Sequence, residues 1–224
     1  MTLEVKTWNH RRIYYRPGTS DADMIEIILE KRQEYHLPKN ISPRRIVDIG
    51  ANIGITALLM AHEWPHAEIH CYEPDPQNFE ILAMNTAPLP NVKIVQAALG
   101  EFSGSEFLYR SDNPTNFGGS SFFDLGTNAE DRLEVEVLNA AFEFERIGPV
   151  DLIKIDCEGA EEGILFSLDR KLHDVQYILG EAHGYDDFTM FKQLSDRFDL
   201  AIFKPMGVRC YPFYAKRRSD GRAL

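Results

Sequence analysis

The chain has 224 residues and a formal net charge of −11, enough for a single domain over residues 1–224 with a full core and too little for a second sizeable unit. The acidic balance excludes a protein that binds a phosphate backbone through clustered Lys and Arg, so we expect no nucleic-acid partner. Because no apolar run could cross a bilayer and "MTLEVKTWNHRRIYY" is charged where a signal peptide is apolar, we expect a cytoplasmic protein without a membrane partner.

Residues 1–40 are expected to form an extension ahead of the core. The alternation in "VKTWNHRRIYYR" predicts a strand, and the apolar spacing in "SDADMIEIILEKRQEY" predicts a helix. Ser20 followed by Asp23 resembles a capping box in which Asp replaces Glu or Gln. We expect this extension either to cover a site or to pair subunits of a homo-oligomer.

Between residues 41 and 215, strand-like and helix-like stretches alternate. The predicted strands are "RIVDIG", "AEIHCYE", "VKIVQAAL", "DLIKIDCE" and "VQYILGEAH", and "ITALLMAHEW" and "PQNFEILAMNTA" are predicted helices. Such alternation is typical of right-handed βαβ units. It predicts an α/β, Rossmann-like fold with a mostly parallel sheet and helices on both faces.

Two features modify this pattern. An insertion at about 101–140 contains two short predicted strands, "SEFLYRS" and "LEVEVL", which flank a loop rich in Gly, Ser and Asn. After a predicted helix in "DDFTMFKQLSDRF", the chain ends in a predicted antiparallel hairpin that turns at Met206 and Gly207. A hairpin at the end of a parallel sheet favours the methyltransferase variant of this fold over the dinucleotide-binding one.

The three cysteines are Cys71, Cys157 and Cys210. They are odd in number, widely spaced and set among apolar residues, so we expect reduced packing residues rather than a disulfide framework or a zinc knuckle.

The stretch "DIGANIG" marks a candidate ligand site. Gly50 and Gly54 bracket the turn from a strand into a helix, where bare N–H groups can contact a ligand. The third glycine of the dinucleotide fingerprint is missing, and Glu73 lies roughly twenty residues further on, at the distance of a carboxylate that binds ribose hydroxyls. Asp48 could meet a positive group. A ligand that has a ribose and an ammonium group but no phosphate fits S-adenosylmethionine. Alternatively, the glycines could form a purely structural turn, Asp48 could cap that turn, and Glu73 could be a solvated strand end.

Five stretches in this order, "VDIGANIG", "YEPDP", "NFGGSS", "DLIKIDCEGAE" and "GEAH", resemble the FkbM-type S-adenosylmethionine-dependent methyltransferases. The resemblance runs from about Arg45 to about Tyr214. It implies a seven-stranded fold and O-methylation of a small molecule such as a sugar or a natural-product intermediate. Cys157 departs from the aliphatic residue expected at its position, and we expect it to pack.

The resemblance also implies which residues bind the donor. Gly50, Asn52 and Gly54 would lie around the methionine portion, Glu73 on the ribose, and Asp156 under the amino group. The remaining residues of this predicted donor site are Asp48, Ala51, Pro74, and Gln96 and Ala97, the last two beside adenine.

Methyl transfer to a hydroxyl also needs a proton acceptor, which we expect at the carboxyl ends of the fourth and fifth strands. These ends carry Asp156, Glu158 and Glu161, and Glu181 and His183. Glu181 and His183 project to one face of a strand. We predict His183 as the base, with Glu181 and Asp156 as further catalytic residues, because a histidine pKa lies near neutrality.

Two alternatives to this base remain open. His183 could simply pack at the strand end, or a divalent ion held by Asp156, Glu181 and His183 could acidify the hydroxyl. The base is preferred because no ligand spacing here is diagnostic of a metal. Lys154 could pair with one of the acids or reach solvent.

The insertion loop "NPTNFGGSSFF" is expected to contact a small-molecule acceptor through Asn116, Ser120 and Ser121. It could instead be a plain connector. The rival functions are a donor-binding module without turnover and a NAD-dependent dehydrogenase. The dehydrogenase would need a third glycine near Gly54, where the chain has Ile55-Thr56-Ala57.

Overall fold

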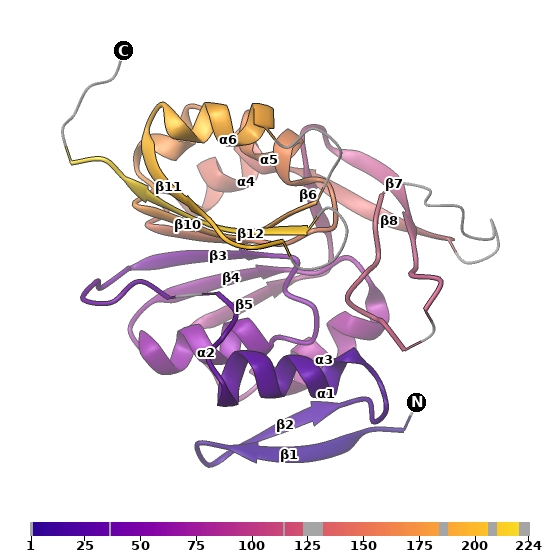
Figure 1. Ribbon diagram of the computed structural model, residues 1–224. Coiled ribbons are helices and arrows are strands. Elements are labelled where there is room, and N and C mark those ends of the chain that lie inside the picture. Colours follow the sequence, from indigo (N-terminus) through magenta and orange to yellow (C-terminus); the bar gives the residue numbers. More distant parts are fainter. Residues whose placement is uncertain are drawn as a thin grey trace.

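The computed structural model describes residues 2–35, 37–113, 115–122, 132–183, 188–205 and 210–219. Within these ranges a central sheet lies between two layers of helices, and the N-terminal hairpin lies outside the lower layer in Figure 1. The predicted turn at Met206 and Gly207, and part of the predicted insertion loop, fall outside the described residues.

The central sheet has seven strands in the order β11-β12-β10-β9-β3-β4-β5. β12 pairs antiparallel with both β10 and β11, and the other pairs are parallel. This confirms the predicted mostly parallel sheet with a C-terminal antiparallel hairpin. The bounds are β3 Arg45–Ile49, β4 Glu68–Tyr72, β5 Val92–Val95, β9 Leu152–Ile155, β10 Tyr177–His183, β11 Phe198–Ile202 and β12 Cys210–Arg217.

Each face of the sheet carries its own hydrophobic core. On one face, α4 (Ala140–Ile147), α5 (Glu161–Ser167) and α6 (Phe188–Ser195) cover a core built around Ile153 and Ile155. On the other face, α2 (Ile55–Glu63) and α3 (Pro76–Thr86) cover a second core. α2 is buried along most of its length because the N-terminal extension packs over it.

The N-terminal extension differs from the prediction in two ways. The predicted single strand is a hairpin of β1 (Glu4–Trp8) and β2 (Arg11–Tyr15), because Asn9 and His10 turn the chain with φ of 46° and 64°. The predicted helix is shorter: α1 (Ser20–Met24) continues as one π-helical segment, η1 (Ile25–Glu30). Its cap is Thr19, not Ser20, since the Thr19 hydroxyl accepts a hydrogen bond from Asp21 N.

The insertion forms a small third sheet in the order β6-β8-β7. β7 (Gly104–Tyr109) and β8 (Arg132–Asn139) confirm the two predicted strands. β6 (Ala98–Gly100) was expected as the end of the strand that is β5, but it leaves the central sheet and pairs with β8. A short 3-10 helix, η3 (Lys171–His173), precedes β10.

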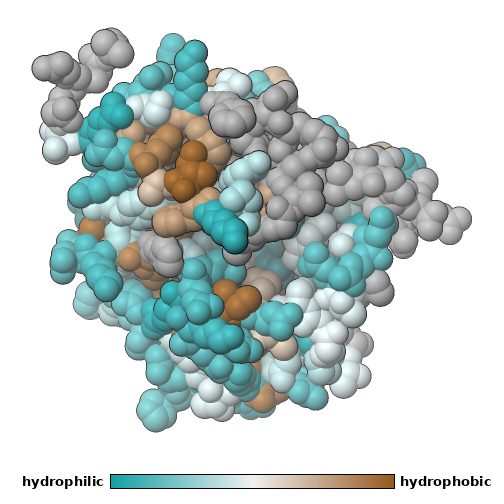
Figure 2. Space-filling view, in the orientation of Figure 1, coloured by the Kyte–Doolittle hydropathy of each residue, from teal (hydrophilic) through white to brown (hydrophobic). Residues whose placement is uncertain are grey.

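The described helices contain no segment long and apolar enough to span a membrane. On the face shown in Figure 2, hydrophobic surface occurs as separate patches among hydrophilic residues.

A buried ion pair anchors the N-terminal extension to the core. Arg16 and Asp21 are 3% and 0% exposed, and the guanidinium donates to both Asp21 oxygens at 2.8 and 2.9 Å. Arg16 also donates to Asn78 Oδ1 of α3 at 2.8 Å. Its guanidinium stacks on the ring of Phe117, 3.8 Å from the centroid. The pair therefore joins the extension, α3 and the insertion loop.

The substitution Asp21→Asn is expected to lower the free energy of unfolding by about 3–5 kcal/mol, because it leaves Arg16 as a buried charge without its counter-ion. Urea denaturation measures the effect. The matched control is Glu30→Gln in the exposed pair with Lys6, whose side chains are 42% exposed; it should cost less than about 1 kcal/mol. Equal effects of the two variants would contradict the anchoring role.

Candidate functional site

The turn after β3 brings two strand ends into close contact. Gly50, Asn52 and Gly54 have φ of 76°, 50° and 86°, in the left-handed region that glycine and asparagine tolerate best. The N–H of Gly50 donates to Tyr72 O at 3.0 Å, which fixes the turn to the end of β4. A Cβ on Gly50 would lie 1.9 Å from Asp156 O, so glycine is needed for this approach.

Glu73 follows β4 and directs its carboxylate at the same turn. Oε2 accepts a hydrogen bond from Asn52 N at 2.8 Å, and Oε1 accepts one from Asp75 N at 2.9 Å. Burial, opposed by these two N–H groups, raises the pKa of Glu73 to about 7. A carboxylate has about four acceptor positions, so capacity remains for the hydroxyl donors of a ribose.

A cavity of about 190 Å³ lies beside this turn and Glu73. The predicted site residues that line it are Gly50, Ala51, Asn52, Glu73, Pro74, Asn116, Ser120 and Asp156. The buried Oδ1 of Asn52 has no hydrogen-bond partner among the described residues. A tight backbone turn, a buried carboxylate and an acceptor without a partner fit the hydroxyl and ammonium donors of an adenosyl amino acid.

Some predicted donor-site residues lie away from this cavity. Gln96 is exposed and Ala97 is fully buried, because the chain bends there from β5 into β6. Ala98 and Leu99, the next residues, line the cavity instead. Gly54 is not among the lining residues either; a Cβ there would lie 2.7 Å from Leu82 Cδ1 of α3.

Asp48 is buried beneath the turn, where its partner is Lys154 of β9. Lys154 Nζ lies 3.3 Å from Asp48 Oδ1 and 3.9 Å from Asp156 Oδ2, and it donates to Gly50 O at 2.7 Å. Burial raises the pKa of Asp48, against the effect of Lys154. The positive group that Asp48 meets therefore belongs to the protein, whereas the sequence left open a ligand or a capping role.

The segment after η1 contributes residues that no motif predicted. The Tyr35 hydroxyl donates to Asp156 Oδ2 at 2.5 Å, and Lys154 Nζ lies 5.2 Å from the centre of the Tyr35 ring. Glu34 and Tyr35 line the cavity beside the Gly50 turn, which we call the donor cavity after the predicted donor, and also a second cavity of about 320 Å³. These two residues thus lie where the two cavities adjoin, and they belong to the irregular chain that follows η1.

The described part of the insertion loop reaches the donor cavity from the side of α1. Asn116 and Ser120 line the cavity, and Phe117 N donates to the Ser20 hydroxyl at 3.3 Å. The Ser121 hydroxyl donates instead to Glu158 O at 2.6 Å, which holds the loop against the chain after β9. Contact with an acceptor remains a prediction for all three polar residues.

His183 lies among carboxylates at the end of β10. Its Nδ1 is 3.1 Å from Glu161 Oε1 and 3.9 Å from Asp156 Oδ1, and its Nε2 is 3.5 Å from Glu181 Oε2 and 3.7 Å from Glu158 Oε2. Burial alone would lower the pKa of His183, but the hydrogen bonds and negative charges around it raise the pKa well above its usual value. This removes the reason for choosing His183 as a neutral base.

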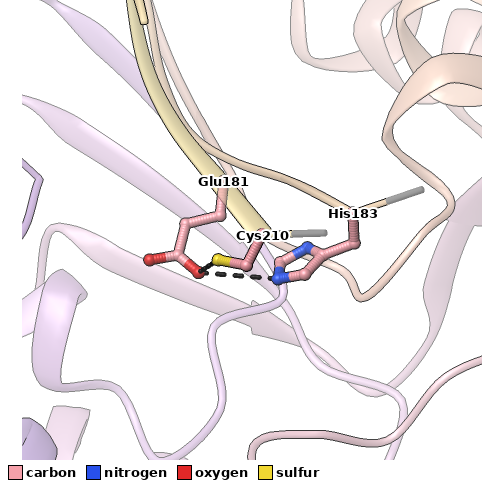
Figure 3. A group of neighbouring side chains, drawn as sticks. All are labelled: Glu181, His183 and Cys210. Carbon is pink, nitrogen blue, oxygen red and sulfur yellow. Dashed lines mark hydrogen bonds and ion pairs between the residues drawn. The ribbon is translucent and has the colours of Figure 1, made fainter. Parts of the chain in front are cut away.

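The expected metal ligands Asp156, Glu181 and His183 do not converge on one point, because the two acids face opposite nitrogens of the imidazole. The structure brings together two other groups: Glu181, His183 and Cys210, and Asp156, Glu161 and His183. Figure 3 shows the first, in which one Glu181 oxygen faces both the Cys210 sulfur and His183. No sequence motif predicted Cys210, because only the pairing of β12 with β10 brings it beside the other two residues.

Comparisons with known proteins identify a family. Residues 48–203, more than half of the chain, match the Methyltransferase FkbM domain. The hexuronic acid methyltransferase AglP of Haloferax volcanii is 24% identical over 177 residues, 79% of this chain and 68% of AglP. The 2-O-methyltransferase NoeI of Sinorhizobium fredii is 23% identical over 189 residues, 73% of this chain and 75% of NoeI.

Fibrillarin of Aeropyrum pernix, solved with natively bound S-adenosyl-L-methionine, aligns over 95% of this chain and 82% of its own, with a TM-score of 0.52. The two sequences are 13% identical, so this likeness is one of fold. It is the class I methyltransferase fold that the strand order describes.

The affinity for S-adenosylhomocysteine is expected to fall as the pH drops from 8 to 6, by at most about tenfold per pH unit, because Glu73, with a pKa of about 7, is a weaker acceptor of hydroxyl hydrogen bonds once it is protonated. Glu73→Gln should weaken binding at pH 8 by about 1.5–3 kcal/mol and remove this pH dependence. Isothermal titration calorimetry measures both. The exposed Glu106→Gln is the control, and an unchanged affinity in Glu73→Gln would refute the ribose contact.

Proposed function

Because the chain belongs to the FkbM methyltransferase family, we propose that it transfers a methyl group from S-adenosylmethionine to a hydroxyl of a sugar-like small molecule. The main support for this proposal is the donor cavity, where the Gly50 turn and the Glu73 carboxylate meet at the carboxyl edge of the sheet. Open α/β sheets bind their ligands at this edge.

The donor, when bound, supplies an activated methyl group on a sulfonium, and the chain supplies position and charge. The Glu34, Asp156 and Glu158 carboxylates line the donor cavity. These acidic groups suit a cationic donor better than a nicotinamide dinucleotide with its pyrophosphate. Alignment of the reacting groups can account for about 7–11 kcal/mol of the barrier.

The second cavity is the proposed acceptor site. It adjoins the donor cavity at Glu34 and Tyr35, and its walls include the aromatic side chains of Phe213 and Tyr214 and the Glu181 carboxylate. Apolar rings with a few placed polar groups are the usual lining of a small-molecule site. Carboxylates suit the hydroxyl donors of a sugar, and the names of AglP and NoeI support a sugar-like acceptor and an oxygen nucleophile.

Glu34 is the proposed proton acceptor in place of His183. It lies where the two cavities adjoin, so a hydroxyl that enters from the second cavity would pass its carboxylate on the way to the donor. Asp156 is less suited to this role, since Lys154 and His183 each lie 3.9 Å from its carboxylate and favour its ionised form. Tyr35 would then hold Asp156 in place while Glu34 takes the proton.

The test of the function is methyl transfer from S-adenosylmethionine labelled in its methyl group to a panel of methyl glycosides, uronic acids and hydroxylated polyketides. The expected product is a methyl ether on a sugar, identified by NMR, together with binding of S-adenosylhomocysteine and no binding of NAD. Binding without turnover on any acceptor would support a donor-binding module instead. Preference for NAD would overturn the proposal.

The substitution Glu34→Gln is expected to lower kcat by about 10²–10⁴-fold, because the amide cannot accept the hydroxyl proton. The Kd of S-adenosylhomocysteine should change little. Steady-state kinetics on the acceptor found above measures the split, with the exposed Glu26→Gln on η1 as control. A normal kcat in Glu34→Gln would return the role of base to Asp156 or Glu158.

A further inference from the structure

We propose that Glu181, His183 and Cys210 form a site for a zinc ion. One ligand atom from each residue lies within 4.8 Å of the other two, and Figure 3 shows the three side chains converging from two neighbouring strands. The site goes beyond the proposed function, which needs only a donor and an acceptor.

The pairing of β10 with β12 places these residues together. His183 lies directly opposite Cys210 in the antiparallel register. Glu181 precedes His183 by two positions on β10, so its side chain leaves the same face of the strand. The ligands therefore lie on two paired strands inside the sheet rather than on a loop, and this pairing fixes their backbone positions before any ion binds.

The distances suit a tetrahedral ion. Nitrogen and oxygen ligands of zinc, with bonds of about 2.0–2.2 Å, lie about 3.3–3.5 Å apart. His183 Nε2 and Glu181 Oε2 are 3.5 Å apart, so this pair already has the required spacing. The Cys210 sulfur is 2.9 Å from Glu181 Oε2, and it would move outward by about 0.7 Å to reach the spacing of about 3.6 Å that a thiolate and a carboxylate have on zinc.

A second observation is the support behind His183. Its other nitrogen, Nδ1, lies 3.1 Å from Glu161 Oε1. Glu161 is 1% exposed and is itself fixed, since it accepts from Cys157 N and from Gly159 N, each at 2.9 Å. A carboxylate that holds the remote nitrogen of a histidine is the usual support of a metal-binding imidazole, because it sets the tautomer that leaves Nε2 free to bind.

A third observation is the charge balance. Four carboxylates, those of Asp156, Glu158, Glu161 and Glu181, lie within 3.9 Å of the one imidazole of His183. Glu181 is 7% exposed, and its Oε1 has no hydrogen-bond partner in the described ranges. Buried carboxylates in such excess are costly without further positive charge, which a divalent ion supplies.

The donor set indicates which ion. Carboxylate, imidazole and thiolate together suit zinc better than magnesium or calcium, which prefer oxygen ligands. Three protein ligands leave the fourth position open, as in catalytic zinc sites. Glu181 also lines the second cavity, so an acceptor hydroxyl could take that position and lose its proton more easily; this role, unlike the site itself, rests on the proposed function.

The test uses the full chain, stripped with a chelator and titrated with Co²⁺, which reports its ligands by absorption. The expected result is one Co²⁺ per chain with a cobalt–thiolate charge-transfer band that Zn²⁺ displaces. Cys210→Ser should abolish the band, and Cys157→Ser, the matched cysteine control, should keep it. Glu161→Gln should weaken Co²⁺ binding by about 10–100-fold.

X-ray absorption of the wild-type protein loaded with Zn²⁺ covers the case in which Cys210→Ser fails to fold, because it should show one sulfur among the ligands. Absence of the band in the wild type, its survival in folded Cys210→Ser, or a shell without sulfur would overturn the proposal. Binding of S-adenosylhomocysteine is measured on the same stripped protein. Its loss would count against the proposed function and leave the metal result standing.

Discussion

The carboxyl edge of the sheet depends on one buried cation, Lys154. Its ammonium binds the carbonyl of Gly50 and lies between Asp48 and Asp156, and it is 2% exposed. An ammonium without these partners would cost several kcal/mol at this depth. The Lys154 ammonium therefore contacts the turn at Gly50, the end of β9 and the Tyr35 ring that covers it. This is why the donor cavity and the acidic cluster form one connected site.

The same edge gathers more buried carboxyl groups than a stable core requires. Burial and neighbouring carboxylates raise the pKa of Glu34, Glu73 and Glu158, and Glu158 adopts a φ of 55°, which is unfavourable for its side chain. Strained backbone and crowded like charges are typical of functional sites, where stability is lost in favour of binding. Cationic ligands would relieve this repulsion, and the proposed donor and ion are both cationic.

The local sequence predicted those parts of the site whose structure depends only on neighbouring residues in the chain. The turn at Gly50 followed from the need for a residue without a side chain, and Glu73 from its place at a strand end. Glu34 was missed because no periodic pattern marks the chain after η1. Cys210 was missed because only the pairing of β10 with β12 brings it beside Glu181 and His183. Gln96 was misplaced because β5 ends at Val95, before the end of the apolar run, and the chain then enters β6 of another sheet. Tertiary contacts decided all three.

The central claim is that the turn at Gly50 and the Glu73 carboxylate hold an adenosyl donor. A crystal structure of the protein soaked with S-adenosylhomocysteine tests it most directly. The account predicts both ribose hydroxyls within hydrogen-bonding distance of Glu73 and the amino-acid portion against the Gly50 turn. A nucleoside bound elsewhere, or a Glu73 carboxylate that contacts only the backbone of Asn52 and Asp75 while the ligand is present, would contradict it.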